Sequence, residues 1–185
     1  MTGREAAATL RRCDSSLKVK LIAICEFSTV PFQTLTQSIR ISAKPQKVWD
    51  AILDPNAGNK WRNAHFATDW YVGDRIEIEA IIGAKRYRDK GRVVKVEPPS
   101  LLQYTYWSQV SGLRDVTESY STITMALEPE GEETILTVIQ QVPPSPVRRG
   151  KGWEIGAESG AKHVAFYWRM TLPILKRIVE ENSES

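Results

Sequence analysis

Few residues in this sequence have the type and spacing that catalysis requires. The two histidines are His65 and His163, and both cysteines, Cys13 and Cys25, lie near the N-terminus. A zinc site takes about four nitrogen, sulfur or oxygen ligands, often as closely spaced pairs, and no such pair occurs. The Gly-x-Ser-x-Gly turn of serine hydrolases, phosphate-binding loops and dinucleotide-binding glycine motifs are also absent. The sequence therefore predicts no metal and no cofactor, and an enzyme is the less favoured class.

Asp89 is the main candidate for an acid or base. Alternation along residues 85–96 places it on the strand face that also carries Tyr87 and that is expected to meet a helix. A buried carboxylate without a partner has a raised pKa, so Asp89 could anchor a ligand or exchange a proton, with a tyrosine or His163 nearby. The favoured alternative places Asp89 at the sheet rim in contact with water, and His163 beside the apolar stripe of a helix.

Aromatic residues form the second group with functional potential. They could line a pocket for a small apolar or aromatic molecule, or they could fill a dry core. Tyrosine and tryptophan need polar partners when buried, which favours a partly polar pocket. The predicted ligand-binding residues are Trp61, Phe66, Trp70, Ile76, Ile78, Tyr87, Asp89, Tyr104, Tyr106, His163 and Tyr167.

The hairpin over residues 74–96 fixes the position of Asp89. Gly83-Ala84 is a two-residue loop of the type that favours a type II′ turn, and it pairs Ile82 with Lys85. The further opposed pairs predicted by counting outward are Glu79–Arg88, Glu77–Lys90, Ala80–Tyr87, Ile78–Asp89 and Ile76–Gly91. Opposite charges then meet on the wet face, so turn chemistry and charge pairing predict the same register. The basic stripe that includes Arg86, Arg88, Lys90 and Arg92 is accordingly interpreted as a solvated face, not a phosphate site.

The remaining periodicity predicts an α+β fold. Strands are expected at 36–42, 102–107, 120–127 and 134–141 besides the hairpin, with two short helices after the first strand. Short turns between strands imply an antiparallel sheet of six to seven strands. Residues 160–181 have the spacing of a long closing helix. Its predicted apolar face comprises Val164, Phe166, Tyr167, Met170, Thr171, Leu172, Ile174, Leu175 and Ile178. Such a helix needs a curved sheet to pack against.

Charge and cysteine usage limit the classes of partner. The chain has 185 residues and a net charge of +3, and residues 1–35 hold five basic and three acidic residues. We expect residues 1–35 to be a poorly ordered extension, residues 36–181 to form one domain and residues 182–185 to be a tail. The domain is then nearly neutral, which predicts no nucleic-acid partner, and no apolar run approaches the length of a membrane span. Absence of cysteine from the domain predicts a cytoplasmic protein.

Several segments resemble the SRPBCC or START-like superfamily, and most closely its heat-shock protein 90 ATPase activator-like subfamily. These segments are Ile39–Ile52, Asp54–Trp61, Gly91–Leu102, Thr134–Val138, and the helix positions Trp168, Leu172 and Leu175. The resemblance implies a helix-grip fold, in which a curved antiparallel sheet wraps around the C-terminal helix. It also implies three functions: a ligand cavity between sheet and helix, a polyketide cyclase- or aromatase-like enzyme using Asp89 or His163, or a module that contacts a chaperone through Arg148–Lys151. The first is favoured, and the oligomeric state stays open.

Overall fold

The computed structural model describes residues 31–181, with the side chain of Trp153 excepted. Most of the predicted extension over residues 1–35, and the predicted tail over 182–185, lie outside the described residues. The first strand begins at Gln33, slightly before the predicted start of the domain.

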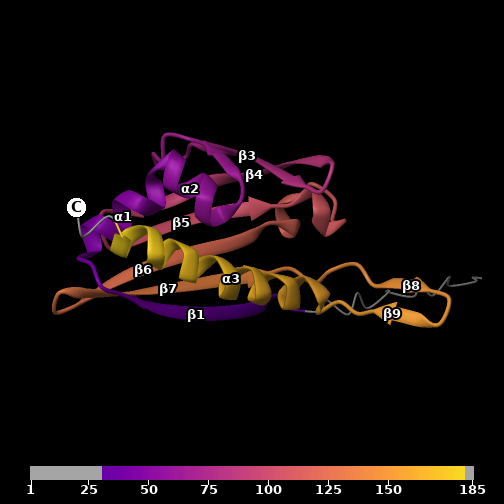
Figure 1. The fold of residues 1–185 in the computed structure, drawn as a ribbon. Helices are drawn as coiled ribbons and strands as arrows, with labels where there is room; N and C mark the ends of the chain where they lie inside the picture. Colours follow the sequence, from indigo (N-terminus) through magenta and orange to yellow (C-terminus); the bar gives the residue numbers. More distant parts are fainter. Residues whose placement is uncertain (1–30, 182–185) are drawn as a thin grey trace, which may run out of the picture.

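The core of the fold is one antiparallel sheet with the strand order β1-β7-β6-β5-β4-β3-β2. Figure 1 shows this sheet from β1 to β3. Its strands are β1 (Gln33–Ile41), β2 (His65–Ala67), β3 (Arg75–Ile82), β4 (Lys85–Glu97), β5 (Leu101–Trp107), β6 (Ser121–Glu130) and β7 (Glu133–Val142). The helices are α1 (Pro45–Leu53), α2 (Pro55–Arg62) and α3 (Ser159–Glu181), with short 3-10 turns at Gln109–Ser111 and Thr117–Ser119. This arrangement confirms the predicted α+β fold, with two short helices after the first strand and a long helix packed on the sheet.

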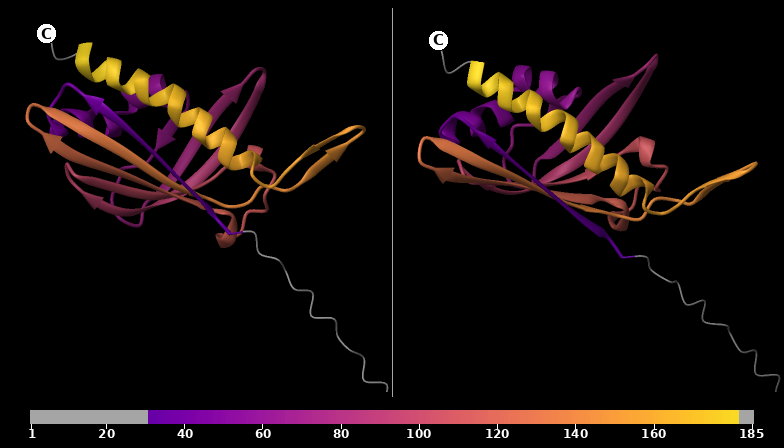
Figure 2. Two further views of the ribbon diagram at one scale, coloured as in Figure 1. Left: turned by 90° about the horizontal axis from the view of Figure 1, so that it is seen from below. Right: turned by 60° about the horizontal axis from the view of Figure 1, so that its bottom comes forward.

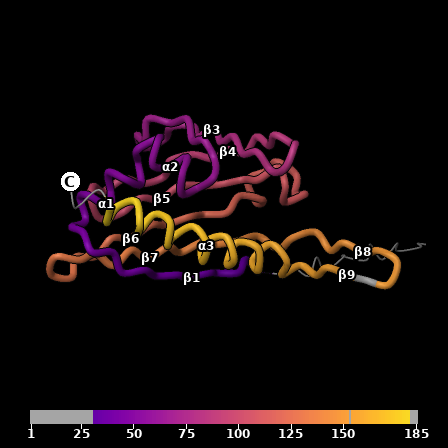
Figure 3. Tube along the Cα trace, viewed as in Figure 1, coloured from indigo at the N-terminus to yellow at the C-terminus, as the bar shows by residue number. Residues whose placement is uncertain are grey.

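Two short features were not predicted. β2 adds the seventh strand at the edge beside β3, and a separate hairpin is formed by β8 (Arg148–Gly150) and β9 (Trp153–Ile155). Strands of three residues are too short for alternation to identify them. The β8–β9 hairpin extends away from the sheet beyond the first turn of α3, as the trace in Figure 3 shows.

The β3–β4 hairpin has the predicted register, including the Ile78–Asp89, Glu79–Arg88 and Ile82–Lys85 pairs. The predicted charge pairing is present in part, because Glu79 contacts Arg86 and Arg88 at 3.7 and 3.8 Å, whereas Lys90 contacts Asp115. These ion pairs support the interpretation of the basic stripe as a solvated face.

A glycine and a bulge adapt β4 to its neighbour β5. A Cβ atom at Gly91 would lie 1.9 Å from the carbonyl oxygen of Thr105, so no other residue fits there without movement of the backbone. The register then shifts between Val93 and Lys95, which is a β-bulge and locally bends the strand.

Helix α3 lies across one face of the sheet, as both views in Figure 2 show. Its buried residues include Trp168, Leu172, Leu175 and Val179, which follow helical spacing. Phe166 and Met170 are 52% and 53% exposed, so their predicted place on the buried face is wrong. Each lies two residues before a buried position, Trp168 or Leu172. Two residues correspond to about 200° around a helix, so Phe166 and Met170 point away from the sheet.

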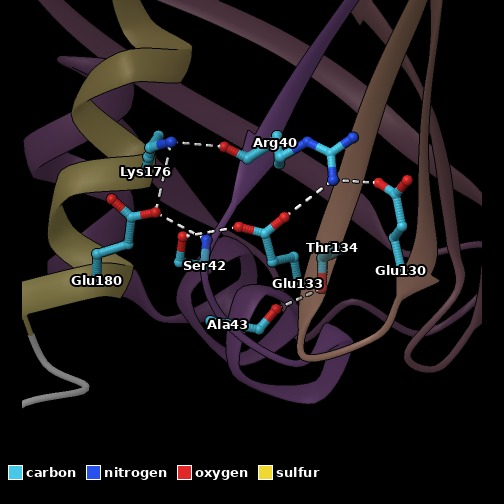
Figure 4. Close-up of polar contacts among 8 residues, drawn as sticks. All are labelled: Arg40, Ser42, Ala43, Glu130, Glu133, Thr134, Lys176 and Glu180. Atoms are coloured by element: carbon cyan, nitrogen blue, oxygen red, sulfur yellow. Dashed lines mark hydrogen bonds and ion pairs between the residues drawn. The ribbon is translucent and has the colours of Figure 1, made fainter.

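A polar network connects the end of β1 to the β6–β7 turn (Figure 4). Arg40 Nη1 contacts Glu130 and donates to Glu133 Oε2 at 2.9 Å, and Ser42 Oγ donates to Glu133 Oε1 at 3.1 Å. These hydrogen bonds lower the pKa of Glu133, and the hydrogen bonds that Arg40 donates to Glu133 and Glu130 raise the pKa of Arg40.

The same network reaches the last turns of α3. Lys176 Nζ donates to the carbonyl oxygen of Arg40 at 2.9 Å, and Glu180 Oε1 accepts from the backbone N–H of Ser42 at 2.7 Å. We call Arg40, Ser42, Glu130, Glu133, Lys176 and Glu180 the strand-end network. It fixes the C-terminal half of α3 to the first strand.

Candidate functional site

Helix α2 delivers two neighbouring residues to the space between the sheet and α3. Its start is defined by Asp54, whose side chain accepts from the backbone N–H of Ala57 at 2.6 Å, and by Pro55 in the first turn. Trp61 is fully buried and Arg62 is 3% exposed. The helix therefore places an indole and a guanidinium in the interior.

The Arg62 guanidinium is surrounded by aromatic rings. Its central carbon lies 4.3 Å from the ring centre of Trp61, 4.6 Å from that of Phe66 and 5.6 Å from that of Trp70. Such contacts replace part of the hydration that a cation loses on burial. We call Arg62, Trp61, Phe66 and Trp70 the Arg62 cage.

Hydrogen bonding in the cage is incomplete. Arg62 Nη2 donates to the carbonyl oxygen of Ile52 at 2.7 Å, in the last turn of α1. Within residues 31–181, Arg62 Nε and Trp61 Nε1 are buried and have no hydrogen-bond partner. Burial lowers the pKa of Arg62, while the nearby hydroxyls of Tyr104 and Tyr167 act in the opposite direction.

Gly58 provides the space that the guanidinium occupies. A Cβ atom at this position would lie 2.7 Å from Arg62 Nη1, which is shorter than a normal non-bonded contact. Packing of the Arg62 side chain therefore explains why a glycine, which is unfavourable inside a helix, occupies position 58.

Further aromatic rings extend the cage toward the sheet and α3. Phe66 and Trp70 are stacked with ring centres 6.3 Å apart, and Tyr104 meets both rings edge-on at 6.5 and 5.8 Å. Tyr167 Oη donates to the backbone carbonyl of Arg62 at 3.3 Å. Burial raises the pKa of both Tyr104 and Tyr167, so these hydroxyls stay protonated at neutral pH.

Trp70 has a strained backbone. Its φ is 61°, in the left-handed region that bulky residues rarely occupy, and it lies in the loop between β2 and β3. Strained residues of this kind are concentrated at functional sites and switch regions. The loop that carries Trp70 is therefore a candidate moving part.

Asp89 is buried and has two hydrogen-bond donors. It is 6% exposed, with the hydroxyl of Tyr106 2.5 Å from Oδ2 and the backbone N–H of Gln109 2.8 Å from Oδ1. The structure thus differs from both expectations for this residue, since the carboxylate neither lies at a wet rim nor lacks a partner. Burial, followed by the charge of Asp89, raises the pKa of Tyr106 well above its ordinary value.

Most of the predicted ligand-binding residues come together. Ile76, Ile78, Trp61, Trp70 and Tyr104 belong to one buried cluster, with Phe66, Tyr106 and Tyr167 packed against it. Tyr87 is half-buried on β4, and His163 is exposed on the first turns of α3. The ligand-binding role of this set stays a prediction. His163 is exposed, whereas Asp89 is buried.

Arg62 was absent from the predicted set. Arginine is mostly exposed in proteins, and α2 is too short for its periodicity to show that this arginine faces inward. The sequence signal that could have identified Arg62 is its position directly after Trp61, one helical turn after Gly58.

Two open depressions lie elsewhere, on the surface near the strand-end network. One of about 500 Å³ is lined by Ser42, Ala43, Lys44, Gln46, Lys47, Asp50 and Glu132. The other, of about 270 Å³, is lined by Pro173, Lys176, Arg177, Glu180 and Glu181. Neither includes a predicted site residue.

The family is decided by a match over residues 42–180 to the activator of Hsp90 ATPase homolog 1-like proteins. This chain belongs to that family. No curated protein sequence matches it. The match confirms the predicted resemblance. It begins directly after β1 and covers the other strands, α1, α2 and all but the last residue of α3.

Solved structures of similar fold support this assignment. The solution structure of ChR145 from Cytophaga hutchinsonii has a TM-score of 0.64 at 23% identity, over 84% of this chain and 99% of that one. CalU16 from Micromonospora echinospora has a TM-score of 0.58 at 21% identity, over 83% of this chain and 80% of that one. The Aha1 dimer from Colwellia psychrerythraea has a TM-score of 0.58 at 17% identity, over 80% of this chain and 96% of that one. At these identities the likeness concerns the fold. Within residues 31–181, no helix of this family member has the length and apolarity needed to cross a membrane.

Proposed function

We propose that this protein binds a small apolar or aromatic molecule between the sheet and α3. The observation that carries the proposal is the pair of buried N–H donors without acceptors, Trp61 Nε1 and Arg62 Nε, on neighbouring residues. A buried donor left unpaired costs about 1–3 kcal/mol, and a ligand with a suitable acceptor would recover that free energy. The surrounding rings of Phe66, Trp70 and Tyr104 suit an aromatic or apolar body.

Binding requires motion of the segments that cover this space. Trp61 and Tyr104 are almost completely buried, so a ligand reaches them when a covering segment moves away. The loop of Trp70 is the favoured segment because its backbone is strained and its ring forms one wall of the cage.

A binding role is favoured over acid–base catalysis. The cyclase- or aromatase-like alternative requires Asp89 and His163 to face one substrate. Asp89 is already engaged with Tyr106 and Gln109, and His163 is exposed. These positions give the enzymatic alternative no support.

Two measurements test the proposal. Native mass spectrometry of protein purified from its own source should show a mass increment that disappears on denaturation. Titration with the neutral fluorophore N-phenyl-1-naphthylamine should give saturable binding at one site per chain. Phe66→Ala, which removes one wall, should weaken this binding, whereas Phe166→Ala on the exposed face of α3 should not. Absence of both co-purified ligand and fluorophore binding would contradict the proposal.

A second candidate, contact with a chaperone, is supported by the β8–β9 hairpin. This hairpin projects from the body (Figure 1). Its residues Arg148, Arg149 and Lys151 are exposed. Co-precipitation with purified Hsp90 should decrease in the variant with Arg148→Glu and Lys151→Glu, but not in the matched variant with Arg86→Glu and Arg88→Glu. Recovery of no Hsp90 by the unaltered protein at low salt would contradict this candidate, which also assumes the predicted cytoplasmic location.

A further inference from the structure

Arg62 has a charge that the described part of the chain does not neutralise. Among residues 31–181, no carboxylate forms an ion pair with it, and Ile52 O is the acceptor recorded for one of its five N–H groups. A carbonyl at the end of α1 is a favourable but partial partner, because it carries only a fraction of a negative charge. A buried cation of this kind is costly unless it is paired and hydrogen-bonded.

The acid that could neutralise Arg62 from within the described interior is already engaged elsewhere. Asp89 is the one buried acid among the described residues, and its two oxygens accept from Tyr106 and Gln109. Tyr104 and Tyr167 lie close to Arg62, but their raised pKa values keep them neutral. The counter-charge is therefore missing from the described interior.

The geometry of the cage restricts where a counter-ion could bind. The rings of Trp61, Phe66 and Trp70 interact with the guanidinium, and Gly58 lies against Nη1. Nε is the buried donor of Arg62 without a partner, and Trp61 Nε1 on the neighbouring residue is a second. Two unpaired donors on neighbouring residues suit an oxyanion, which can accept several hydrogen bonds at once.

We infer that the ligand of this interior is an aromatic acid with a single negative charge, whose oxyanion pairs with Arg62. This inference rests on the proposed binding function and specifies its ligand class. One guanidinium neutralises one negative charge, whereas a dianionic phosphate would leave an uncompensated charge in the interior. The aromatic body follows from the walls, which are rings of Phe66, Trp70 and Tyr104.

The test compares two fluorophores that differ by one acidic group. 1-Anilinonaphthalene-8-sulfonate carries a sulfonate, and N-phenyl-1-naphthylamine has the same rings without it. The unaltered protein should bind the sulfonate roughly tenfold more tightly than the neutral compound, since hydrogen bonds to charged groups have this magnitude. Arg62→Met should abolish the preference while binding of the neutral compound persists. The matched control is Arg169→Met, because Arg169 also lies over an aromatic ring, that of Phe166 at 5.6 Å, but at the surface.

A second measurement needs no stable variant. The side-chain Nε–H resonance of Arg62 in a ¹H–¹⁵N spectrum of the unaltered protein should shift on addition of the sulfonate and stay in place with the neutral compound. Equal binding of both fluorophores without such a shift would overturn the anionic ligand class and leave the proposed binding function intact. If neither compound binds and no ligand co-purifies, both proposals fail. Loss of the preference in Arg169→Met as well would assign it to surface charge and would also overturn the inference.

Discussion

The two halves of α3 pack against different parts of one hydrophobic core. The C-terminal half buries aliphatic side chains, among them Leu172, Leu175 and Val179, and is fixed to β1 through Lys176 and Glu180. The N-terminal half presents Tyr167 and Trp168 to the aromatic rings and the buried Arg62. Dry aliphatic packing contributes stability directly, whereas the aromatic region contains two donors on α2 without acceptors, Trp61 Nε1 and Arg62 Nε. Under the proposed function, the C-terminal half of α3 holds the fold together and the region beside the N-terminal half receives the ligand.

The largest effect is expected in the aliphatic half. Leu175→Ala should lower the free energy of unfolding by about 2–5 kcal/mol, because it leaves a cavity at a fully buried position. Urea unfolding monitored by circular dichroism measures the loss. The relative affinity for the two fluorophores should stay unchanged in this variant. A changed preference would mean that the two halves are not independent.

The buried carboxylate of the sheet should give the next effect. Tyr106→Phe removes the hydroxyl that donates to Asp89 Oδ2. It should lower the free energy of unfolding by about 1–3 kcal/mol, because the buried oxygen is then left without this donor. Tyr120→Phe is the control, because Tyr120 also donates to a carboxylate, Asp115 at 2.7 Å, but at an exposed position. Equal losses for both variants, measured by chemical unfolding, would show that burial of Asp89 has no energetic consequence.

Crowding of the Arg62 cage should lower the free energy of unfolding by a smaller amount. The direction of this change should depend on whether Arg62 is present. Gly58→Ala gains about 1 kcal/mol of helix propensity, but its Cβ displaces the guanidinium, and we expect a net destabilisation. In the Arg62→Met background the obstruction is gone, so the same substitution should stabilise the protein. A double-mutant cycle of unfolding free energies measures this change of sign. Additivity of the two substitutions would contradict the packing role of Gly58.

The smallest effect is expected at the strand-end network, and it should depend on pH. Hydrogen bonds from Arg40 and Ser42 lower the pKa of Glu133 below its ordinary value of 4.5. The folded state therefore binds fewer protons near that pH than the unfolded state. The stabilisation is present above the unfolded pKa and is lost as the pH falls through the folded pKa.

Thermal unfolding between pH 7 and pH 3 checks this expectation. Glu133→Gln should be less stable than the unaltered protein at pH 7, and the difference should shrink below about pH 4.5. The neighbouring Glu132→Gln is the control, because its side chain is 83% exposed and a smaller effect is expected there. A constant difference across the pH range would rule out the ion pair as the cause.

Prediction from the sequence succeeded where short-range rules apply. The Gly83-Ala84 turn and the alternation of Ile76, Ile78 and Ala80 were enough to determine the register of β3 and β4. The predictions on Phe166 and Met170 were wrong, because an amphipathic pattern with apolar residues on several sides does not define which side faces the sheet.

The candidate site was predicted in part. Trp61, Trp70 and Tyr104 were selected for their aromatic character, and the structure brings them together around one charge. Arg62 was missed because its burial results from the packing of α2 against β2 and α3. The hydrogen bonds of Asp89 likewise depend on Gln109, twenty residues further along the chain.

The sequence by itself determined the antiparallel sheet, its hairpin register and the helix that closes the fold, because periodicity and turn chemistry act between near neighbours. Tertiary structure alone decided which cation is buried, which carboxylate is satisfied and which donors stay unpaired. These properties depend on distances between segments far apart in the chain, and such distances exist only once the helices have packed on the sheet.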